Sequence, residues 1–337
     1  MAESRKVVYF LGAGASLGAG ATAHVQGGGE LSIPTQATFW DTFLRFCRSS
    51  ARRKRVESFL FRYFMGYGKV PSRSGPAERR RSLNVCDVEE VFTFLSERVR
   101  APSTTAQLRT YASEVWDDLV AEVGNVFRRF EANSGTRHSY RLLYRHHIRS
   151  FDTVVSFNYD TVFEDSLPQK VKWGYEGIDD CTKRLSVLKP HGSINWAFEE
   201  GQVTLASAPE RCVIVAPTHL KFITGSDHSE TGAKFAGYLD QAPQIQKIWA
   251  ALERAMKDAR ALVFIGYSFP VADLYFSSLL RSVLALRESS PAIVLVNPDA
   301  VALSERLSRR FAVGRAVRYF DMTQFIQATR RDVFGQI

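Results

Sequence analysis

Residues 6–16 read KVVYFLGAGAS, and this stretch decides the fold. The run over residues 6–11 is rich in β-branched and aromatic side chains, which predicts a buried β-strand. Gly12 ends the strand, and the segment from Gly12 to Ser16 opens a helix. Glycines allow a tight turn and let backbone N–H groups approach a pyrophosphate. A merely tight strand-to-helix connection would use the same residues, so this motif alone leaves both interpretations open.

Buried strands alternate with amphipathic helices in the second half of the chain. Strands are predicted at residues 153–157, 186–188, 213–215, 261–265 and 292–296, and helices at about 244–258 and 272–286. This alternation is typical of right-handed crossovers in a parallel sheet. The predicted fold class is therefore α/β, a Rossmann-like parallel sheet with an α-helical insertion domain.

The insertion is predicted from a helical pattern that begins near Phe39 and ends near Ile148. One of its helices begins at Asp87, which is a capping residue with Glu90 three positions later. Apolar residues at helical spacing follow and form one face of this helix. Two further helices are expected at about 105–131 and 138–149. Loops are expected at about 69–82 and in the glycine-rich stretch up to Thr35. The expected division is a core of residues 1–35 and 150–337 and an insertion of residues 36–149.

Composition indicates a globular chain with excess positive charge. The 337 residues are 45% hydrophobic and 23% charged, with a formal net charge of +9, so a packed core is expected. Basic clusters at residues 52–55 and 79–81 invite a nucleic-acid interpretation. A solvated helix face and a mobile loop explain them better, and an anionic ligand would also benefit from a positive field. Direct nucleic-acid binding therefore stays open.

The sequence shows no apolar run long enough for a membrane span and no signal peptide, so the expected compartment is the cytoplasm. The four cysteines are scattered, with no pair at two-residue spacing, which disfavours a compact zinc site and a disulfide framework. They are Cys47, Cys86, Cys181 and Cys212. Six of the seven histidines are interpreted as structural: His24, His138, His146, His147, His219 and His228.

Polar residues follow several of the predicted strands. Asn158 and Asp160 follow the strand at 153–157, where the amide can orient ribose hydroxyls and a water molecule. Asp160 also suits the cap of the next helix, and it can perform both tasks. His191 follows the next predicted strand and is the natural general base near neutral pH.

The two last strands end in similar groups. Gly266 and Ser268 follow one of them, and Asn297 follows the other; all three also fit ordinary turn chemistry. Ligands of open parallel sheets lie beyond the carboxyl ends of the strands. The sequence therefore predicts that these residues form one site.

In this order, the motifs resemble the sirtuin family. The matching segments are Gly12 to Ser16, Ile33-Pro34, Asn158 with Asp160, His191-Gly192, Gly266-Tyr267-Ser268 and Val296-Asn297. Three segments resemble the divergent sirtuin-like proteins of prokaryotic antiviral defence: FNYD at 157–160, KPHGSINW at 189–196 and IGYSF at 265–269. The resemblance covers residues 1–35 and about 150–320, and does not extend into the insertion.

The resemblance implies an enzyme that hydrolyses NAD to nicotinamide and ADP-ribose. It implies that Asn158 positions the nicotinamide ribose and a water molecule, and that His191 is the general base. Gly12 to Ser16 would hold the pyrophosphate, and Ser268 and Asn297 the phosphate–ribose side. The implied NAD-binding set is Gly12, Ala13, Gly14, Ser16, Pro34, Thr35, Asp160, Gly266, Ser268 and Asn297.

The chain departs from the family in one respect. Protein-deacylating sirtuins carry a small module with two cysteine pairs that hold zinc, and this sequence lacks it, so no zinc is expected and water is favoured as the acceptor. The resemblance also implies infection-triggered activation, a homo-oligomer and a separate regulatory partner such as a helicase-like ATPase. The insertion is the expected assembly surface, unless its aromatic residues only fill its own core; these are Phe59, Phe61, Tyr63 and Phe64.

Two rival functions use the same pocket. One is an NAD-dependent protein deacylase or ADP-ribosyltransferase, which the missing cysteine pairs disfavour. The other is a non-catalytic subunit that binds NAD or ADP-ribose. A dehydrogenase is disfavoured, because Leu17 stands where the usual dinucleotide fingerprint has its third glycine.

Overall fold

The computed structural model describes residues 6–24, 29–66, 75–130, 132–179, 184–209, 212–215, 242–311, 313–314 and 316–335. Cys181, His219 and His228 lie outside these ranges. Within them, no helix is both long and apolar enough to cross a membrane.

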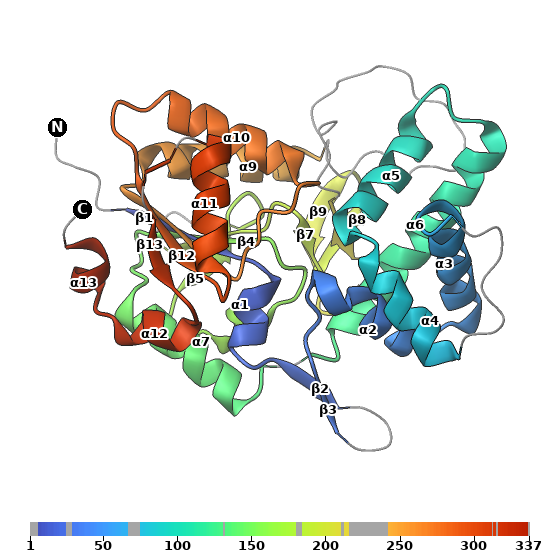
Figure 1. Ribbon diagram of the computed structural model, residues 1–337, viewed down its shortest axis with the longest axis horizontal. Coiled ribbons are helices and arrows are strands. Elements are labelled where there is room, and N and C mark those ends of the chain that lie inside the picture. The colour runs from blue at the N-terminus through green and yellow to red at the C-terminus, as the bar shows by residue number, and fades with distance from the viewer. Residues whose placement is uncertain are drawn as a thin grey trace.

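A parallel sheet of seven strands forms the centre of the described structure, in the order β13-β12-β11-β1-β4-β6-β5 (Figure 1). The strands are β1 (Val7–Leu11), β4 (Thr153–Ser156), β5 (Trp173–Tyr175), β6 (Leu185–Leu188), β11 (Ala261–Ile265), β12 (Ala292–Val296) and β13 (Val317–Tyr319). Every neighbouring pair is parallel. The predicted Rossmann-like fold class is therefore confirmed.

The central strand β1 is buried along its whole length. Its residue Tyr9 lies between Val263 of β11 and Val154 of β4 in the register of the sheet. Phe10 stacks on Phe264 of β11 with ring centroids 4.5 Å apart. A strand that is covered on both faces can be apolar without alternation, which is why the sequence of β1 is an uninterrupted apolar run.

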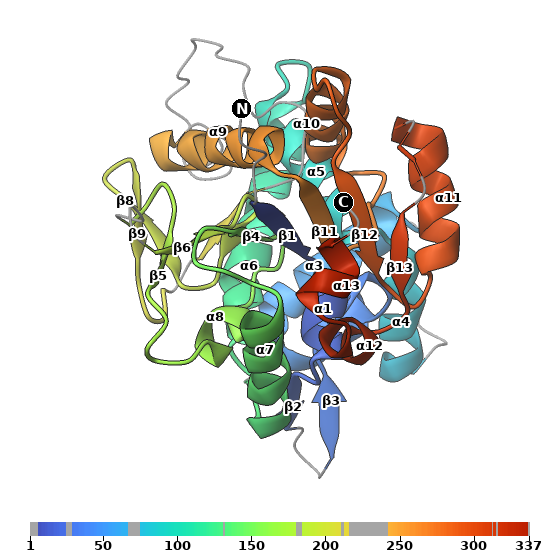
Figure 2. The ribbon, with the colours of Figure 1, turned by 90° about the vertical axis from the view of Figure 1, so that its left-hand side faces the viewer.

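Helices cover both faces of the sheet. Figure 2 shows α9 (Pro243–Asp258) and α10 (Leu274–Ala285) over one face, and α7 (Ser134–His146), α8 (Val162–Ser166) and α12 (Met322–Gln327) over the other. The remaining core helices are α1 (Ala13–Gly18), α11 (Ala300–Phe311) and α13 (Arg330–Phe334). The helices predicted before β11 and β12 are thus confirmed.

The insertion forms a helical group beside the core (Figure 1). Its elements are η1 (Gln36–Thr38), α2 (Phe39–Phe46), α3 (Ser50–Tyr63), α4 (Pro76–Ser82), η2 (Leu83–Val85), α5 (Val88–Arg100) and α6 (Ala106–Phe127). Asp87 caps α5 as predicted, since its carboxylate accepts from the backbone N–H groups of Glu89 and Glu90. Helix α7, on the insertion side of the predicted boundary, packs against α8 and α12 of the core.

The basic clusters hold the insertion together. Arg52 pairs with Glu122 at 3.1 Å, and Arg79 pairs with Glu57 at 3.4 Å. The expectation of a loop over 69–82 is wrong for residues 76–82, because Gly75 and Pro76 start α4 there. Phe59 and Phe61 are buried inside the insertion, so these two aromatic residues fill its core and do not form a surface.

Several short strands differ from the predicted elements or were not predicted, and neither were helices α11, α12 and α13. The expected strand at 213–215 is β10 (Val213–Ile214), which pairs antiparallel with β7 (Gly192–Ser193) and lies outside the main sheet. The expected loop before Thr35 contains β2 (Thr22–His24) and β3 (Glu30–Ser32). The hairpin of β8 (Trp196–Glu199) and β9 (Gln202–Leu205), like β5 and β13, was not predicted. β5, β8, β9 and β13 have three or four residues each and lack the uninterrupted apolar run by which the other strands were predicted.

Candidate functional site

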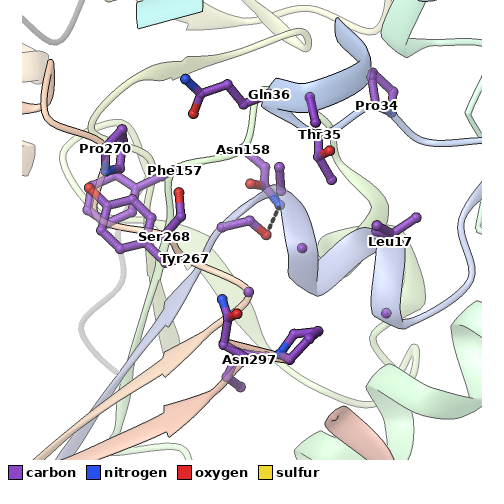
Figure 3. Close-up of a pocket in the computed structure, with 18 of the residues that line it drawn as sticks. Leu17, Pro34, Thr35, Gln36, Phe157, Asn158, Tyr267, Ser268, Pro270 and Asn297 are labelled. Atoms are coloured by element: carbon purple, nitrogen blue, oxygen red, sulfur yellow. Dashed lines mark hydrogen bonds between the residues drawn. The ribbon is translucent and has the colours of Figure 1, made fainter. Parts of the chain in front are cut away.

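A cavity of about 680 Å³ lies beyond the carboxyl ends of the central strands (Figure 3). Every predicted site residue except one lines it, and these residues come from all six of the matching segments: Gly12, Ala13, Gly14, Pro34, Thr35, Asn158, Asp160, His191, Gly266, Ser268 and Asn297. Ser16 does not line it. The volume lies within the range of about 300–1,000 Å³ that is usual for cofactor sites.

The order of the strands explains why the motifs meet. β12, β11, β1, β4 and β6 are consecutive neighbours in the sheet, and each is followed directly by one motif. On one side of β1 lie β4, β6 and β5, which come next in the sequence. On the other side lie β11, β12 and β13, which come last. The gap between β1 and β11 is therefore the topological switch point, where open α/β sheets bind ligands.

Two glycine segments pack backbone to backbone at this switch point. The N–H of Gly14 donates to the carbonyl of Gly266 at 3.0 Å. Gly266 has a φ of +61°, and a Cβ there would lie 2.1 Å from the backbone nitrogen of Ala15. Only glycine fits such an approach, so the end of β11 supports the turn after β1 and keeps its backbone at the cavity wall.

The glycine turn also holds the amide of Asn158. Its Nδ2 donates to the carbonyl of Gly12 at 3.1 Å (Figure 3) and to the hydroxyl of Ser16 at 3.3 Å. None of the described groups donates to its Oδ1. The amide oxygen of Asn158 is therefore the atom that remains available to a ligand or a water molecule in the cavity.

Ser16 lies behind this amide and is almost fully buried. Its hydroxyl is 3.2 Å from the hydroxyl of Tyr140 and 3.3 Å from a carboxylate oxygen of Asp160. A buried hydroxyl with these partners orients Asn158 and Asp160, and it does not reach a ligand in the cavity. This placement differs from the implied contact with a pyrophosphate.

His191 is buried at the cavity wall. Its Nε2 lies 3.4 Å from the Oδ2 of Asp273, and its ring packs on Phe157 with centroids 4.9 Å apart. Asp273 also accepts from the hydroxyl of Tyr267 at 2.6 Å and caps α10. The sequence gives no sign of this contact with His191, because an aspartate directly before a helix is typical of an ordinary N-cap.

Gly192, the residue after His191, allows a close backbone crossing. Gly192 has a φ of +88°, and a Cβ there would lie 2.0 Å from the carbonyl oxygen of Val213. The missing side chain therefore admits the backbone of β10, which accounts for the close β7–β10 pair. The carbonyl of His191 accepts from the N–H of Val215 in the same crossing.

Asp160 forms an Asx turn and lines the cavity. Its carboxylate accepts from the N–H of Val162 at 3.0 Å, but the N-cap of α8 is Thr161, so the expectation that Asp160 is the helix cap is wrong by one residue. Burial raises the pKa of Asp160 from 3.8 to about 6, against the opposing effect of the nearby Lys189 ammonium group. The carboxyl group thus titrates near neutral pH instead of staying ionised throughout.

Other predicted site residues form the hydrogen bonds of ordinary turns and caps. Oδ1 of Asn297 accepts from the N–H of Asp299 at 3.0 Å, and Thr35 caps η1 through Thr38. The carbonyl of Ser268 accepts from Arg306 at 2.6 Å. Asn297, Thr35 and Ser268 still line the cavity, so each residue takes part in turn or cap geometry and also lies at the site.

The insertion supplies part of the cavity wall, which the sequence did not reveal. Its contributions are Gln36, Ala37, Phe39, Val88, Glu89 and Phe127. Phe127 packs on Tyr159 of the core, with centroids 6.1 Å apart. Residues 320–323, which follow β13, line the cavity as well. Both contributions depend on tertiary packing and have no local motif.

Among the described residues, no group of three or more His, Cys, Asp or Glu side chains could hold a metal ion. The three described cysteines are buried, and burial raises the pKa of Cys212 to about 12 and of Cys86 to about 11. These thiols are therefore protonated at neutral pH and are poor nucleophiles and metal ligands.

Comparison with known families identifies the domain. Residues 152–319, about half of the chain, match the family model of the SIR2-like domain. The matched span runs from the residue before β4 to the end of β13, and it contains Asn158, His191 and Gly266. No curated protein matches the chain significantly. SIR2-like domains bind NAD, and their family contains NAD-dependent enzymes. The chain carries such a domain on a matching fold, and it therefore belongs to the sirtuin-like family.

Proposed function

We propose that this protein is an NAD glycohydrolase that cleaves NAD to nicotinamide and ADP-ribose. One observation carries the proposal: Asn158 and His191, 33 positions apart in the sequence, line one cavity together with the glycine turn. The cavity has a backbone wall for a pyrophosphate at Gly12–Gly14. It has an amide oxygen and an imidazole for the reacting ribose.

The reaction needs few groups. The bond between ribose C1′ and the pyridinium nitrogen breaks, and its electron pair leaves with nicotinamide, which departs as a neutral molecule. A water oxygen then bonds to C1′, and the proton lost by the water passes to His191 directly or through a ribose hydroxyl. Oδ1 of Asn158 accepts a hydrogen bond from this water and aligns it, so the protein supplies orientation and a base.

The test is chromatography of NAD after incubation with the purified protein. We expect nicotinamide to appear with NAD alone, without an acceptor protein, since a strict transferase or deacylase would need one. His191→Ala and Asn158→Ala should each lower kcat by roughly 10²–10⁴-fold, the usual contribution of a positioned general base. His138→Ala, at an exposed histidine of α7, is the matched control and should keep full activity.

Release of nicotinamide by His191→Ala at the wild-type rate would disprove the assigned base. Tight NAD binding by calorimetry, with no nicotinamide released under any condition, would instead support the non-catalytic rival. Both measurements use the full chain.

We further propose that the enzyme depletes NAD in the cytoplasm as an effector of antiviral defence, as a homo-oligomer restrained or activated by a separate protein. The family resemblance and the danger of uncontrolled NAD loss support this role. Light scattering of the purified chain tests the oligomer. Cellular NAD measured after phage infection, in cells with wild type or His191→Ala, tests the role, and equal NAD levels would refute it.

A further inference from the structure

A buried ion pair lies next to the two chain segments that carry Asn158 and His191. The Nζ of Lys189 is 3.1 Å from the Oε1 of Glu164, and the two side chains are 0% and 2% exposed. Neither residue lines the cavity. Lys189 comes two positions before His191, at the end of β6, and Glu164 belongs to α8.

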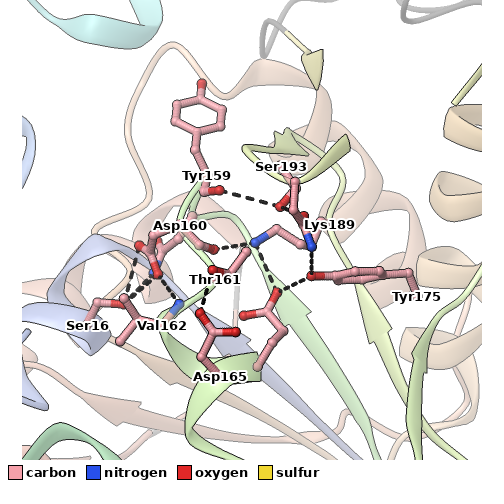
Figure 4. A network of polar contacts seen from close by, with 12 residues as sticks. Ser16, Tyr159, Asp160, Thr161, Val162, Asp165, Tyr175, Lys189 and Ser193 are labelled. Atoms are coloured by element: carbon pink, nitrogen blue, oxygen red, sulfur yellow. Dashed lines mark hydrogen bonds and ion pairs between the residues drawn. The ribbon is translucent and has the colours of Figure 1, made fainter. Parts of the chain in front are cut away.

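The ammonium group of Lys189 also reaches the loop that carries Asn158. It donates to the backbone carbonyl of Asp160, two positions after Asn158, at 2.5 Å (Figure 4). β4 and β6 are neighbours in the sheet, with Val155 paired to Leu188. One side chain therefore ties together the ends of the two strands that carry the amide and the imidazole.

A second chain of hydrogen bonds links Glu164, through Tyr175, to the residues that follow His191 in the sequence (Figure 4). Glu164 accepts from the hydroxyl of Tyr175 at 3.1 Å, and that hydroxyl accepts from the amide of Asn195 at 3.1 Å. Oδ1 of Asn195 accepts from Ser193 at 2.6 Å. The N–H of Ile194 donates to the carbonyl of Tyr159 at 3.0 Å, so both sides of the His191 loop are fastened.

We propose that the Lys189–Glu164 ion pair is a positioning element that fixes Asn158 and His191 relative to each other. Stability does not explain the pair, because replacing a buried ion pair by neutral groups of similar volume is often neutral or stabilising. Correct geometry does explain it, since a misplacement of about 1 Å at a reacting centre can cost about 10²-fold in rate. The inference rests on the proposed function.

The test compares a double variant with wild type. Lys189→Met/Glu164→Gln removes both charges at nearly constant volume and keeps an acceptor for Tyr175. Each single change leaves a buried charge without its partner and is expected to destabilise the fold, so the double variant is the informative one. We expect it to keep the wild-type melting temperature within a few degrees and the wild-type KM for NAD, and to lose roughly 10–100-fold in kcat.

A second buried ion pair provides the matched control. Arg330 and Asp152, 2.9 Å apart, lie at the opposite, amino-terminal edge of the sheet. Asp152→Asn/Arg330→Met should leave kcat unchanged. A stable Lys189→Met/Glu164→Gln variant with kcat within twofold of wild type would overturn the proposal, and so would an equal loss of kcat in the control.

Failure of the proposed function would be recognised separately. If the wild-type chain binds NAD but releases no nicotinamide, hydrogen exchange measured by mass spectrometry replaces kcat as the readout. Backbone amides of residues 157–162 and 189–195 should then exchange faster in the Lys189→Met/Glu164→Gln variant than in wild type or the control. Unchanged exchange in both segments would overturn the positioning role.

Discussion

At the residue scale, the amide of Asn158 is oriented by the turn beside which it lies. Its hydrogens are committed to Gly12 and Ser16, which leaves the amide oxygen free to accept a hydrogen bond in the cavity. In the proposed function the same turn is the backbone wall for the pyrophosphate of NAD. Substrate binding and water alignment would then share one piece of backbone, and a change in either would affect the other.

Ser16→Ala separates two roles for this serine. If Ser16 orients Asn158, as its buried position indicates, kcat should fall about two- to twelvefold, the value of one hydrogen bond of 0.5–1.5 kcal/mol, while KM for NAD stays constant. If the hydroxyl held the pyrophosphate, KM would rise instead. In an Asn158→Ala background the serine change should have no further effect on kcat, and steady-state kinetics of the three variants decides between the roles.

Gly266→Ala tests the contact between the glycine segments. The new Cβ would meet backbone atoms of Gly14 and Ala15 at a positive φ, so the turn must shift, and we expect a loss of NAD binding together with more than about 2 kcal/mol of stability. Gly20→Ala is the control, because Gly20 has a φ of +85° with nothing within 4 Å of its Cβ position. It should cost about 1 kcal/mol by urea unfolding and leave NAD binding intact. Equal costs in the two variants would contradict the close-approach argument.

At the scale of elements, α5 connects the insertion to the cavity. Its first two residues, Val88 and Glu89, line the cavity wall. Asp87 caps the helix and accepts from the side-chain amide of Gln36, which also lines the cavity. The start of α5 is thus fixed to η1, and the insertion shapes the site through this corner.

Asp87→Ala should cost about 1 kcal/mol of stability, the usual value of a helix cap, and should raise KM for NAD because the cavity wall loosens. Thr105→Ala removes the cap of α6, a side chain outside the cavity. It should cost a similar amount of stability without a change in KM. Urea unfolding and steady-state kinetics measure both, and identical kinetics in the two variants would argue against a role of α5 at the site.

At the scale of the whole molecule, two buried groups give stability opposite dependences on pH. Burial raises the pKa of Asp160 to about 6, so the native state binds more protons than the unfolded chain and its stability falls as the pH rises from about 4 to 6. Burial lowers the pKa of His147 from 6.5 to about 4. The stability associated with neutral His147 is therefore present above pH 6.5 and is lost as the pH falls through that range.

Asp160→Asn isolates the first of these contributions. The variant is neutral at every pH, so its unfolding free energy should match that of wild type near pH 4. It should exceed the wild-type value by up to about 3 kcal/mol at pH 7, which corresponds to a shift of about two pKa units. Urea unfolding of both proteins from pH 4 to 8 measures the difference, in which the contribution of His147 cancels. A difference that is constant with pH would show that Asp160 is ionised throughout.

The sequence by itself determined the strands that carry the motifs and the parallel character of the sheet. Residues 7–11 and 261–265 are apolar without interruption and rich in β-branched and aromatic side chains, a pattern that favours buried strands of a parallel sheet. The rule that ligands lie at the carboxyl ends of parallel strands then placed Asn158 and His191 at one edge. Local patterns were sufficient here because the composition of a strand and the residues of its turn are local properties.

Only the tertiary structure decided what surrounds those two residues. The contact of Asp273 with His191, the ion pair of Lys189 with Glu164 and the cavity wall made by α5 join residues that are distant in the sequence. No periodicity in the sequence identifies such partners, since an acidic residue that pairs inside the core looks the same in the sequence as one that only caps a helix. Their identity depends on which elements pack together, and that is set by the burial of apolar surface over the whole molecule.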